Sequence, residues 1–191
     1  MDIYYYFIVH FIDFYPISFP LFYSFHNVLK DGFLIITEPV SVSPFSIALK
    51  TLQDHINYTF QNVQFLERAM THASFSQENN KAFRILGLGV IEASVTLELL
   101  NKNIDTTAKD LNTKISELRN VEASCATNGM WLGLEKVIRV SHKTNSSAPA
   151  VVCGAFRAIF GAVAIDSNSL DKAQTVYLGI QKGGTGKTMV M

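Results

Sequence analysis

The sequence has no excess of charge of either sign. Sixteen Lys and Arg residues balance sixteen Asp and Glu residues, so the formal net charge of the 191-residue chain is +0. A basic excess is what allows a protein to attract a polyanion through its overall electrostatic field. This chain is not of that class, and any site for nucleic acid must be a local patch.

Cysteine is also scarce, and the two that are present form no ligand motif. Cys125 and Cys153 have neither CxxC nor Cys/His spacing, so nothing indicates a structural metal site. Both lie in apolar or small-residue stretches with helical character, where cysteine packs like a small hydrophobe. We therefore expect buried free thiols and no disulfide.

Residues 1–26 have no Lys or Arg and no long uninterrupted apolar run. Five Tyr and several Phe and Ile are broken up by Asp13, Pro16 and Pro20, whereas a membrane-spanning helix needs about 20 consecutive apolar residues. We expect no membrane association. The segment also lacks the cationic start of a secretory signal and the arginines of a mitochondrial presequence.

The segment therefore indicates no subcellular location. A weak or atypical targeting segment and a disordered N-terminus both stay open. An intracellular location is favoured, with the nucleus and organelles as alternatives.

With 48% hydrophobic residues the chain can bury a core as one folded unit. We expect a poorly structured aromatic-rich segment and linker over residues 1–44, a domain over 45–181 and a flexible tail over 182–191. Apolar residues recur at three- and four-residue steps after Pro44, which is typical of helices. The predicted fold class is all-α.

The predicted helices cover residues 46–56, 63–70, 81–101, 121–130, 148–165 and 171–180, with one more that Thr106 or Thr107 caps and that runs through Leu118. The helix over 81–101 has apolar residues on most sides and should be the central one. Small residues at Ala150, Gly154, Ala158 and Gly161 should allow close packing of the helix over 148–165. Residues 134–140 are expected to form an exposed extension of helix or strand.

Three blocks of the sequence resemble ribonuclease III domains. The first is Y-T-F at 58–60 followed by L-E-R-A-M-T-H-A-S at 66–74, which resembles the YxF turn and THxS-like element that open those domains. The second, N-K-A-F-R-I-L-G-L-G-V-I at 80–91, falls where the family has N-E-R-L-E-F-L-G-D-S-V-L. The third, A-F-R-A-I-F-G-A-V at 155–163, is similar to the second acidic helix of the family. The resemblance implies a ribonuclease III-type helical endonuclease domain.

The resemblance also implies where catalytic groups should be. Active members hold Mg²⁺ with carboxylates on two helices, and the metal activates water for phosphodiester hydrolysis. The corresponding positions here are Lys81, Arg84 and Leu88 in one helix, and Gly154 and Arg157 in the other. None is acidic and three are cationic. We therefore expect no catalytic residue, no metal site and no cofactor, since Mg²⁺ would be required only by an active enzyme.

The cationic replacements suggest a different use of the same place. Lys81 and Arg84 are three residues apart on one helix and share a face, and the family packing would bring Arg157 close to them. Our hypothesis is that these three residues bind RNA phosphates. The alternative is that they are solvated or paired with Glu78 and Glu92, as most surface cations are.

Two further motifs are interpreted as structural. His72 has no nearby Asp or Cys in the sequence that would make it a general base, and we expect a hydrogen-bonded structural histidine. The string K-G-G-T-G-K-T at 182–188 resembles a phosphate-binding loop, but only three residues follow it. A helix must follow such a loop for its N-terminus to face the phosphates, so we predict no nucleotide binding.

Three functions remain in competition. The first is a degenerate domain that binds double-stranded or structured RNA or a protein partner of unknown identity, within a ribonucleoprotein assembly and plausibly as a homodimer. The second is an active double-stranded-RNA endonuclease in RNA processing. The third is a protein scaffold that works without RNA. No binding to DNA is predicted.

Overall fold

The computed structural model describes residues 43–120 and 125–184, and within them the fold is helical, as predicted. The helices are α2 (Pro44–Ile56), α3 (Val63–Ala69), α4 (Lys81–Lys102), α5 (Ala108–Arg119), α6 (Ala126–Trp131), the 3-10 helix η2 (Leu134–Lys136), α7 (Pro149–Ser167) and α8 (Leu170–Gly184). In the described part the one β contact is an isolated bridge between Thr71 and Arg139. Most of the predicted segment 1–44 lies outside the described residues.

Local sequence signals explain the helix ends. The hydroxyl of Ser43 accepts a hydrogen bond from the Ser46 backbone N–H at 3.1 Å and caps α2, with Pro44 at its first position. Thr107 caps α5 in the same way by accepting from the Asp110 N–H at 3.2 Å, which confirms one of the two predicted caps. Asn57 and Asn168 end α2 and α7 in the left-handed conformation that asparagine tolerates.

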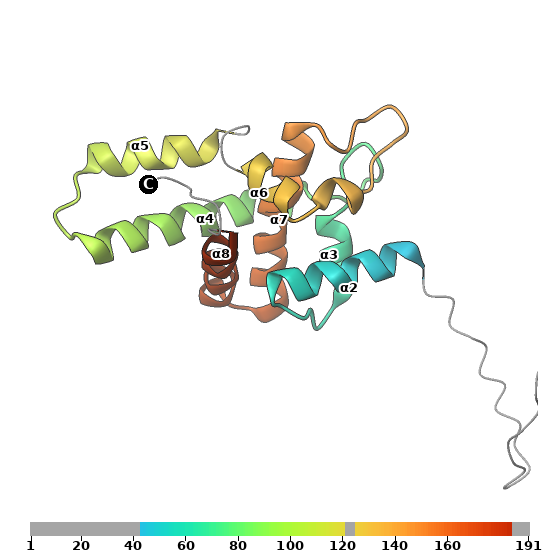
Figure 1. The fold of residues 1–191 in the computed structure, drawn as a ribbon, viewed down its shortest axis with the longest axis horizontal. Helices are drawn as coiled ribbons and strands as arrows, with labels where there is room; N and C mark the ends of the chain where they lie inside the picture. Colours follow the sequence, from blue (N-terminus) through green and yellow to red (C-terminus); the bar gives the residue numbers. More distant parts are fainter. Residues whose placement is uncertain (1–42, 121–124, 185–191) are drawn as a thin grey trace, which may run out of the picture. The chain divides into compact units, whose positions relative to one another are not determined.

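Helix α7 is the centre of the fold (Figure 1), and the prediction that the helix over 81–101 would be central is wrong. Residues of α7 are buried from Val151 almost continuously to Ala164, and α3, α4, α6 and α8 all pack against it. Helix α4 buries only one face, and Ile85 is 73% exposed. Hydrophobicity alone does not separate these two helices, because α4 keeps apolar residues on a face that nothing covers.

Two glycines explain how α4 and α7 approach each other so closely. A Cβ added at Gly161 of α7 would overlap the carbonyl of Phe83, and one added at Gly87 of α4 would overlap the carbonyl of Arg157. The two backbones are therefore in contact at this crossing. The prediction of close packing at Gly161 is confirmed, whereas Ala150 is exposed and takes no part in it.

Helix α7 is also the one described helix that is long and apolar enough to span a membrane, but 72% of that stretch is buried inside the fold. A helix in the core of a folded domain can be equally long and apolar, so the composition of α7 is explained by its place in the core. Helix α8 ends at Gly184, beyond the predicted end at residue 180.

Two other predictions are wrong. Residues 134–140 are not an exposed extension, because Leu134 is fully buried and Ile138 is 7% exposed. The cysteines are not free thiols, because Cys125 and Cys153 form a disulfide that links the beginning of α6 to α7. These residues are 28 positions apart, and only the packing of α6 on α7 brings them together.

Candidate functional site

The N-terminus of α4 is fixed by the segment that precedes it. The buried Asn80 donates from its side chain to the Ala69 carbonyl at 3.2 Å, and its backbone N–H donates to the Thr71 carbonyl at 2.9 Å. The Asn79 side chain then accepts from the Lys81 N–H at 3.1 Å. These contacts tie the beginning of α4 to the end of α3, and so determine where Lys81 and Arg84 stand.

A second set of contacts holds residues 70–72 in place. The Arg139 N–H donates to the Met70 carbonyl at 2.8 Å, and the His72 N–H donates to the Arg139 carbonyl at 2.9 Å. The Arg139 guanidinium donates to the Thr71 hydroxyl at 2.6 Å and lies over the ring of Phe45, with 4.3 Å to the ring centroid. The THxS-like element is thus a rigid support for the helix beside it.

Arg84 reaches from α4 to α7 and lies beside Gly154. A Cβ at Gly154 would be 3.5 Å from Cδ and 3.8 Å from Nη1 of Arg84. The Arg84 side chain therefore lies over the surface of α7 at this glycine. Arg157 is one turn further along α7, and the positive charge of Arg84 contributes to lowering its pKa, after burial, which is the main cause. The structure therefore brings Arg84, Gly154 and Arg157 together.

Arg157 is half-buried and is already engaged. Its Nη2 donates to the carbonyls of Leu118 at 3.1 Å and Arg119 at 3.2 Å, which are the last residues of α5. The last carbonyls of a helix have no partner within the helix. Arg157 therefore acts as a C-terminal cap for α5.

Lys81 stands in the same region, near His72. Burial, Arg84 and Lys81, in that order, lower the pKa of His72. The Nδ1 of His72 lies 2.9 Å from the Ser74 hydroxyl and accepts from the Ser74 N–H at 3.1 Å, so the predicted hydrogen-bonded histidine is confirmed.

We refer to Lys81, Arg84 and Arg157 as the basic cluster. Leu88, the remaining replaced position, is half-buried and adds no charge.

Glu92 is a carboxylate whose charge acts on Arg157, and it does not pair with Lys81 or Arg84. It accepts from Arg119 at 2.7 Å and 3.3 Å. Among the ion pairs of residues 43–120 and 125–184, none joins Lys81 or Arg84 to a carboxylate. The alternative that Glu78 and Glu92 neutralise these two cations is therefore not supported by the described contacts.

Sequence reasoning missed Arg119 as a neighbour of the site. Its charge lowers the pKa of Arg157, while Glu92 acts in the opposite direction. Arg119 of α5 therefore pairs with Glu92 of α4, and the charge of Glu92 also acts on Arg157 of α7. The apolar spacing of α5 predicts the helix, but no signal in the sequence indicates that its C-terminus reaches α7.

The donor set does not fit a divalent metal ion. Mg²⁺ prefers carboxylate and other oxygen ligands in octahedral geometry, whereas the site presents guanidinium and ammonium groups. In the described part of the chain, no three His, Cys, Asp or Glu side chains gather closely enough to hold a metal.

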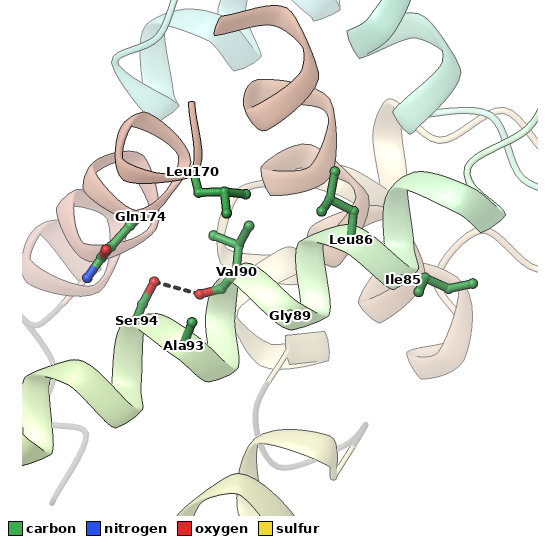
Figure 2. Close-up of a pocket in the computed structure, with 8 residues that line it drawn as sticks. All are labelled: Ile85, Leu86, Gly89, Val90, Ala93, Ser94, Leu170 and Gln174. Carbon is green, nitrogen blue, oxygen red and sulfur yellow. Dashed lines mark hydrogen bonds between the residues drawn. The ribbon is translucent and has the colours of Figure 1, made fainter. Parts of the chain in front are cut away.

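An apolar groove of about 330 Å³ lies on the other side of α4, between α4 and α8 (Figure 2). Within it the Ser94 hydroxyl donates to the Val90 carbonyl of its own helix at 2.7 Å, so this donor is already satisfied within α4. Ile85 and Leu170 border the groove and are 73% and 62% exposed. The residues that line the groove are Ile85, Leu86, Gly89, Val90, Ala93, Ser94, Leu170 and Gln174.

Comparisons with known proteins agree with this fold and with the motifs. A family model described as Ribonuclease-III-like matches residues 62–180. The Arabidopsis thaliana protein NUCLEAR FUSION DEFECTIVE 2 is 47% identical over 175 residues, which cover 90% of this chain and 91% of that protein. The runs at residues 70–80 and 156–162 predict similarity to this plant protein, and the comparison confirms it.

Bacterial relatives and solved structures extend the likeness. Ribonuclease 3 of Bordetella petrii is 30% identical over 136 residues, which cover 69% of this chain and 53% of that enzyme. The chain thus spans about half the length of that relative. The nuclease domain of ribonuclease III from Campylobacter jejuni, solved in a study of flexibility in a region involved in dimer formation, has a TM-score of 0.65 and 26% identity and covers 69% of this chain and 94% of that domain.

Proposed function

Because this chain belongs to the ribonuclease III-like family, we propose that it is a catalytically degenerate member that binds double-stranded or structured RNA through the basic cluster. The observation that carries the proposal is the position of Arg84 beside Gly154, with Arg157 one turn away. Replaced acidic positions of two helices meet there. Cations therefore stand where the family resemblance implies a metal site.

The charge of the cluster argues against cleavage. Two like charges about 4 Å apart repel by about 4 kcal/mol at an effective dielectric constant near 20. A divalent cation would meet Arg84 and Arg157 without the carboxylate oxygens that hold it in an active enzyme. Glu92 does not replace them, because Arg119 occupies it.

The same charge suits a phosphate backbone. Arginine and lysine form charge-assisted hydrogen bonds with phosphate oxygens, and each phosphate that they neutralise releases counterions and makes binding salt-dependent. Lys81 and Arg84 are exposed at the N-terminal end of α4, where the helix dipole also favours an anion. Both features support RNA contact at this end of the helix.

The proposal is tested with the double variant Lys81→Glu/Arg84→Glu and a duplex RNA titrated at several salt concentrations. We expect affinity to fall by about tenfold or more at low salt, and the dependence of binding on salt to become shallower by about two phosphate contacts. The matched control is Lys50→Glu/Lys109→Glu, which makes the same change of net charge at exposed positions of α2 and α5. Equal affinity of the cluster variant and the wild type, or equal losses in both variants, would reject the cluster as the RNA site.

An active endonuclease is the competing function, and a direct assay decides it. The purified chain is incubated with long duplex RNA and Mg²⁺, with and without a chelator. We expect intact RNA in both cases. Metal-dependent cleavage that the chelator abolishes would overturn the assignment as a degenerate member.

We further propose that the chain forms a homodimer through the groove between α4 and α8. Exposed apolar surface around Ile85 and Leu170 supports an interface, and the related Campylobacter nuclease domain has a region involved in dimer formation. Ile85→Glu should give a monomer in sedimentation analysis. Ile47→Glu, on the 55% exposed isoleucine of α2, is the control and should leave the dimer intact. A monomeric wild type would reject the dimer. For the scaffold function the test is a pull-down, and binding of a protein partner that survives ribonuclease treatment would favour that function over RNA binding.

The name of the Arabidopsis relative refers to a defect in nuclear fusion, and we extend a role in that process to this chain. Expression of the chain in a plant that lacks this relative should restore nuclear fusion. The Lys81→Glu/Arg84→Glu variant should fail to do so at equal protein level, because RNA binding is proposed to carry the function.

A further inference from the structure

The disulfide is close to the basic cluster in both sequence and space. Cys153 directly precedes Gly154 on α7, and Arg157 follows it by four residues, or about one helical turn. Cys125 is the N-cap residue of α6 and comes six residues after Arg119, the last residue of α5. The bond therefore joins the beginning of α6 to the part of α7 that carries the cluster.

Helix α5 depends on these ties for its position. None of its residues is buried, and it runs back alongside α4, the helix against which it packs (Figure 1). Its last turn is held by the packing of Leu118 against the core, by the hydrogen bonds from Arg157 and by the pair between Arg119 and Glu92. The Arg119 side chain is 62% exposed, and exposed ion pairs contribute little to stability. A covalent link at Cys125, six residues after Arg119 in the sequence, therefore limits how far this turn can move.

The same contacts control the availability of Arg157. Its Nη2 donates to the carbonyls of Leu118 and Arg119, so a phosphate group that approaches must compete with them. The C-terminal turn of α5 thus accepts hydrogen bonds from Arg157 and keeps its Nη2 from other acceptors. If this turn moves away, the third cation of the cluster becomes free.

We propose that the Cys125–Cys153 disulfide is a reversible redox site that holds the last turn of α5 on Arg157, and that its reduction frees Arg157 for phosphate. The consequence for RNA rests on the proposed function, whereas the hold on α5 does not. In the oxidised protein the turn occupies Arg157. In the reduced protein Arg157 joins Lys81 and Arg84 in binding the anion.

The chemistry requires a dithiol reductant. One of its thiolates attacks a sulfur of the disulfide, releases the other cysteine as a thiolate and forms a mixed disulfide. Its second thiol then displaces the protein sulfur and closes a disulfide within the reductant. Two electrons and two protons pass to the protein, which ends with two thiols. Both cysteines are buried, at 3% and 2% exposure, but α6 has only six residues, and a reductant reaches the bond through local opening of this short helix.

The first measurement is alkylation of the native protein followed by mass spectrometry, before and after dithiothreitol treatment. We expect no labelled cysteine before and two labelled cysteines after. Hydrogen exchange then compares the two states, and amides of α5 should exchange about tenfold faster in the reduced state while those of α7 stay protected. Free thiols in protein purified without reductant, or equal exchange of α5 in both states, would overturn the proposal.

The double variant Cys125→Ala/Cys153→Ala separates loss of the bond from other effects of the reductant. It should match the reduced wild type in exchange and should not respond to dithiothreitol. If this variant does not fold, the comparison of oxidised and reduced wild type still decides the question, because it needs no substitution.

RNA affinity provides the functional measurement. Reduced wild type should bind a duplex RNA about three- to tenfold more tightly than oxidised wild type, with a salt dependence steeper by about one phosphate contact. Arg157→Gln should bind equally in both states. Equal affinity of the two wild-type states would overturn the control of RNA binding. If neither state binds RNA, the proposed function fails, and the exchange measurement still decides whether the disulfide holds α5.

Discussion

Arg84 of α4 lies beside Gly154 of α7, at a distance where a methyl group on the glycine would be 3.5 Å from the arginine Cδ. That is ordinary van der Waals contact, so a Cβ fits at this position. A carboxylate placed there would meet the guanidinium group directly. The contact thus offers a position at which to restore one acid.

Gly154→Asp should weaken RNA binding by about three- to tenfold, because the new carboxylate pairs with Arg84 and repels phosphate. It should not create Mg²⁺-dependent cleavage, since one carboxylate among arginines is not a metal site. Gly154→Asn has nearly the same shape without the charge and is the control. Equal RNA affinity of these two variants would contradict the expected pairing.

His72 reports on the charges around it. Burial, Arg84 and Lys81 lower its pKa from 6.5, so Lys81→Gln and Arg84→Gln should each raise the pKa in an NMR titration of the imidazole. Lys50→Gln on α2 should leave it unchanged. An unchanged pKa in both cluster variants would show that the three side chains do not come together.

The lowered pKa of His72 also fixes the direction of a pH effect. The folded state favours the neutral imidazole, so its contribution to stability is fully present above the unfolded pKa of about 6.5. It is lost as the pH falls from there through the lower pKa of the folded state. His72→Gln should therefore reduce the loss of stability in this acidic window, as measured by urea unfolding at several pH values.

The crossing of α4 and α7 should be highly sensitive to volume. Gly161→Ala places a methyl group against the Phe83 backbone, and we expect a loss of about 3 kcal/mol in the free energy of unfolding. Gly89→Ala is the matched control on α4, because nothing lies within 4 Å of its added Cβ. It should stabilise the protein by up to about 1 kcal/mol, since alanine favours a helix over glycine. Similar effects of the two substitutions would contradict the close crossing.

Asp166 joins the end of α7 to the turn before α3. Its carboxylate accepts from the Tyr58 hydroxyl at 2.7 Å and from the backbone N–H groups of Gln61 at 2.9 Å and Asn62 at 2.8 Å. Asp166→Ala should cost about 2 to 3 kcal/mol in unfolding experiments, and Tyr58→Phe about 1 kcal/mol. A double-mutant cycle should show coupling between them, and additive losses would show that the hydroxyl contact contributes nothing.

The same pair predicts alkaline behaviour. Burial, followed by the hydrogen bond and charge of Asp166, raises the pKa of Tyr58 to about 12. The folded state favours the neutral phenol, so this stability is present below about pH 10 and is lost as the pH rises toward 12. Burial gives Tyr177 a pKa of about 12 as well. Tyr58→Phe should therefore reduce the alkaline loss without abolishing it.

The sequence predicts the helices well because apolar spacing reflects a buried face directly. Residues 63–69 and 81–102 are helical within one residue of the predicted ends. Apolar spacing does not show which of α4 and α7 is the central helix, since Ile85 of α4 is hydrophobic in the sequence although it is exposed in the structure. The repeated small residues at Gly154, Ala158 and Gly161 are the better signal, because they let several neighbouring helices pack closely on α7.

The site was predictable in part. Family motifs place Lys81, Arg84 and Arg157 at corresponding positions, and the structure brings Arg84 and Arg157 together across α4 and α7. The capping of α5 by Arg157 has no sequence signal, because every residue carries a backbone carbonyl. The Cys125–Cys153 bond was missed for a related reason, since a pairing between distant residues depends on packing that local spacing does not encode.

The position of α7 after α3, α4 and α6 in the sequence has a consequence for biosynthesis. Helices α3, α4, α6 and α8 pack on it, yet it begins only at Pro149. While the ribosome synthesises the preceding residues, the amphipathic helices have no surface on which to bury their apolar faces, and short isolated helices are marginal in water. Cooperative folding must therefore wait until α7 has left the exit tunnel. Until then the nascent chain depends on protection from aggregation.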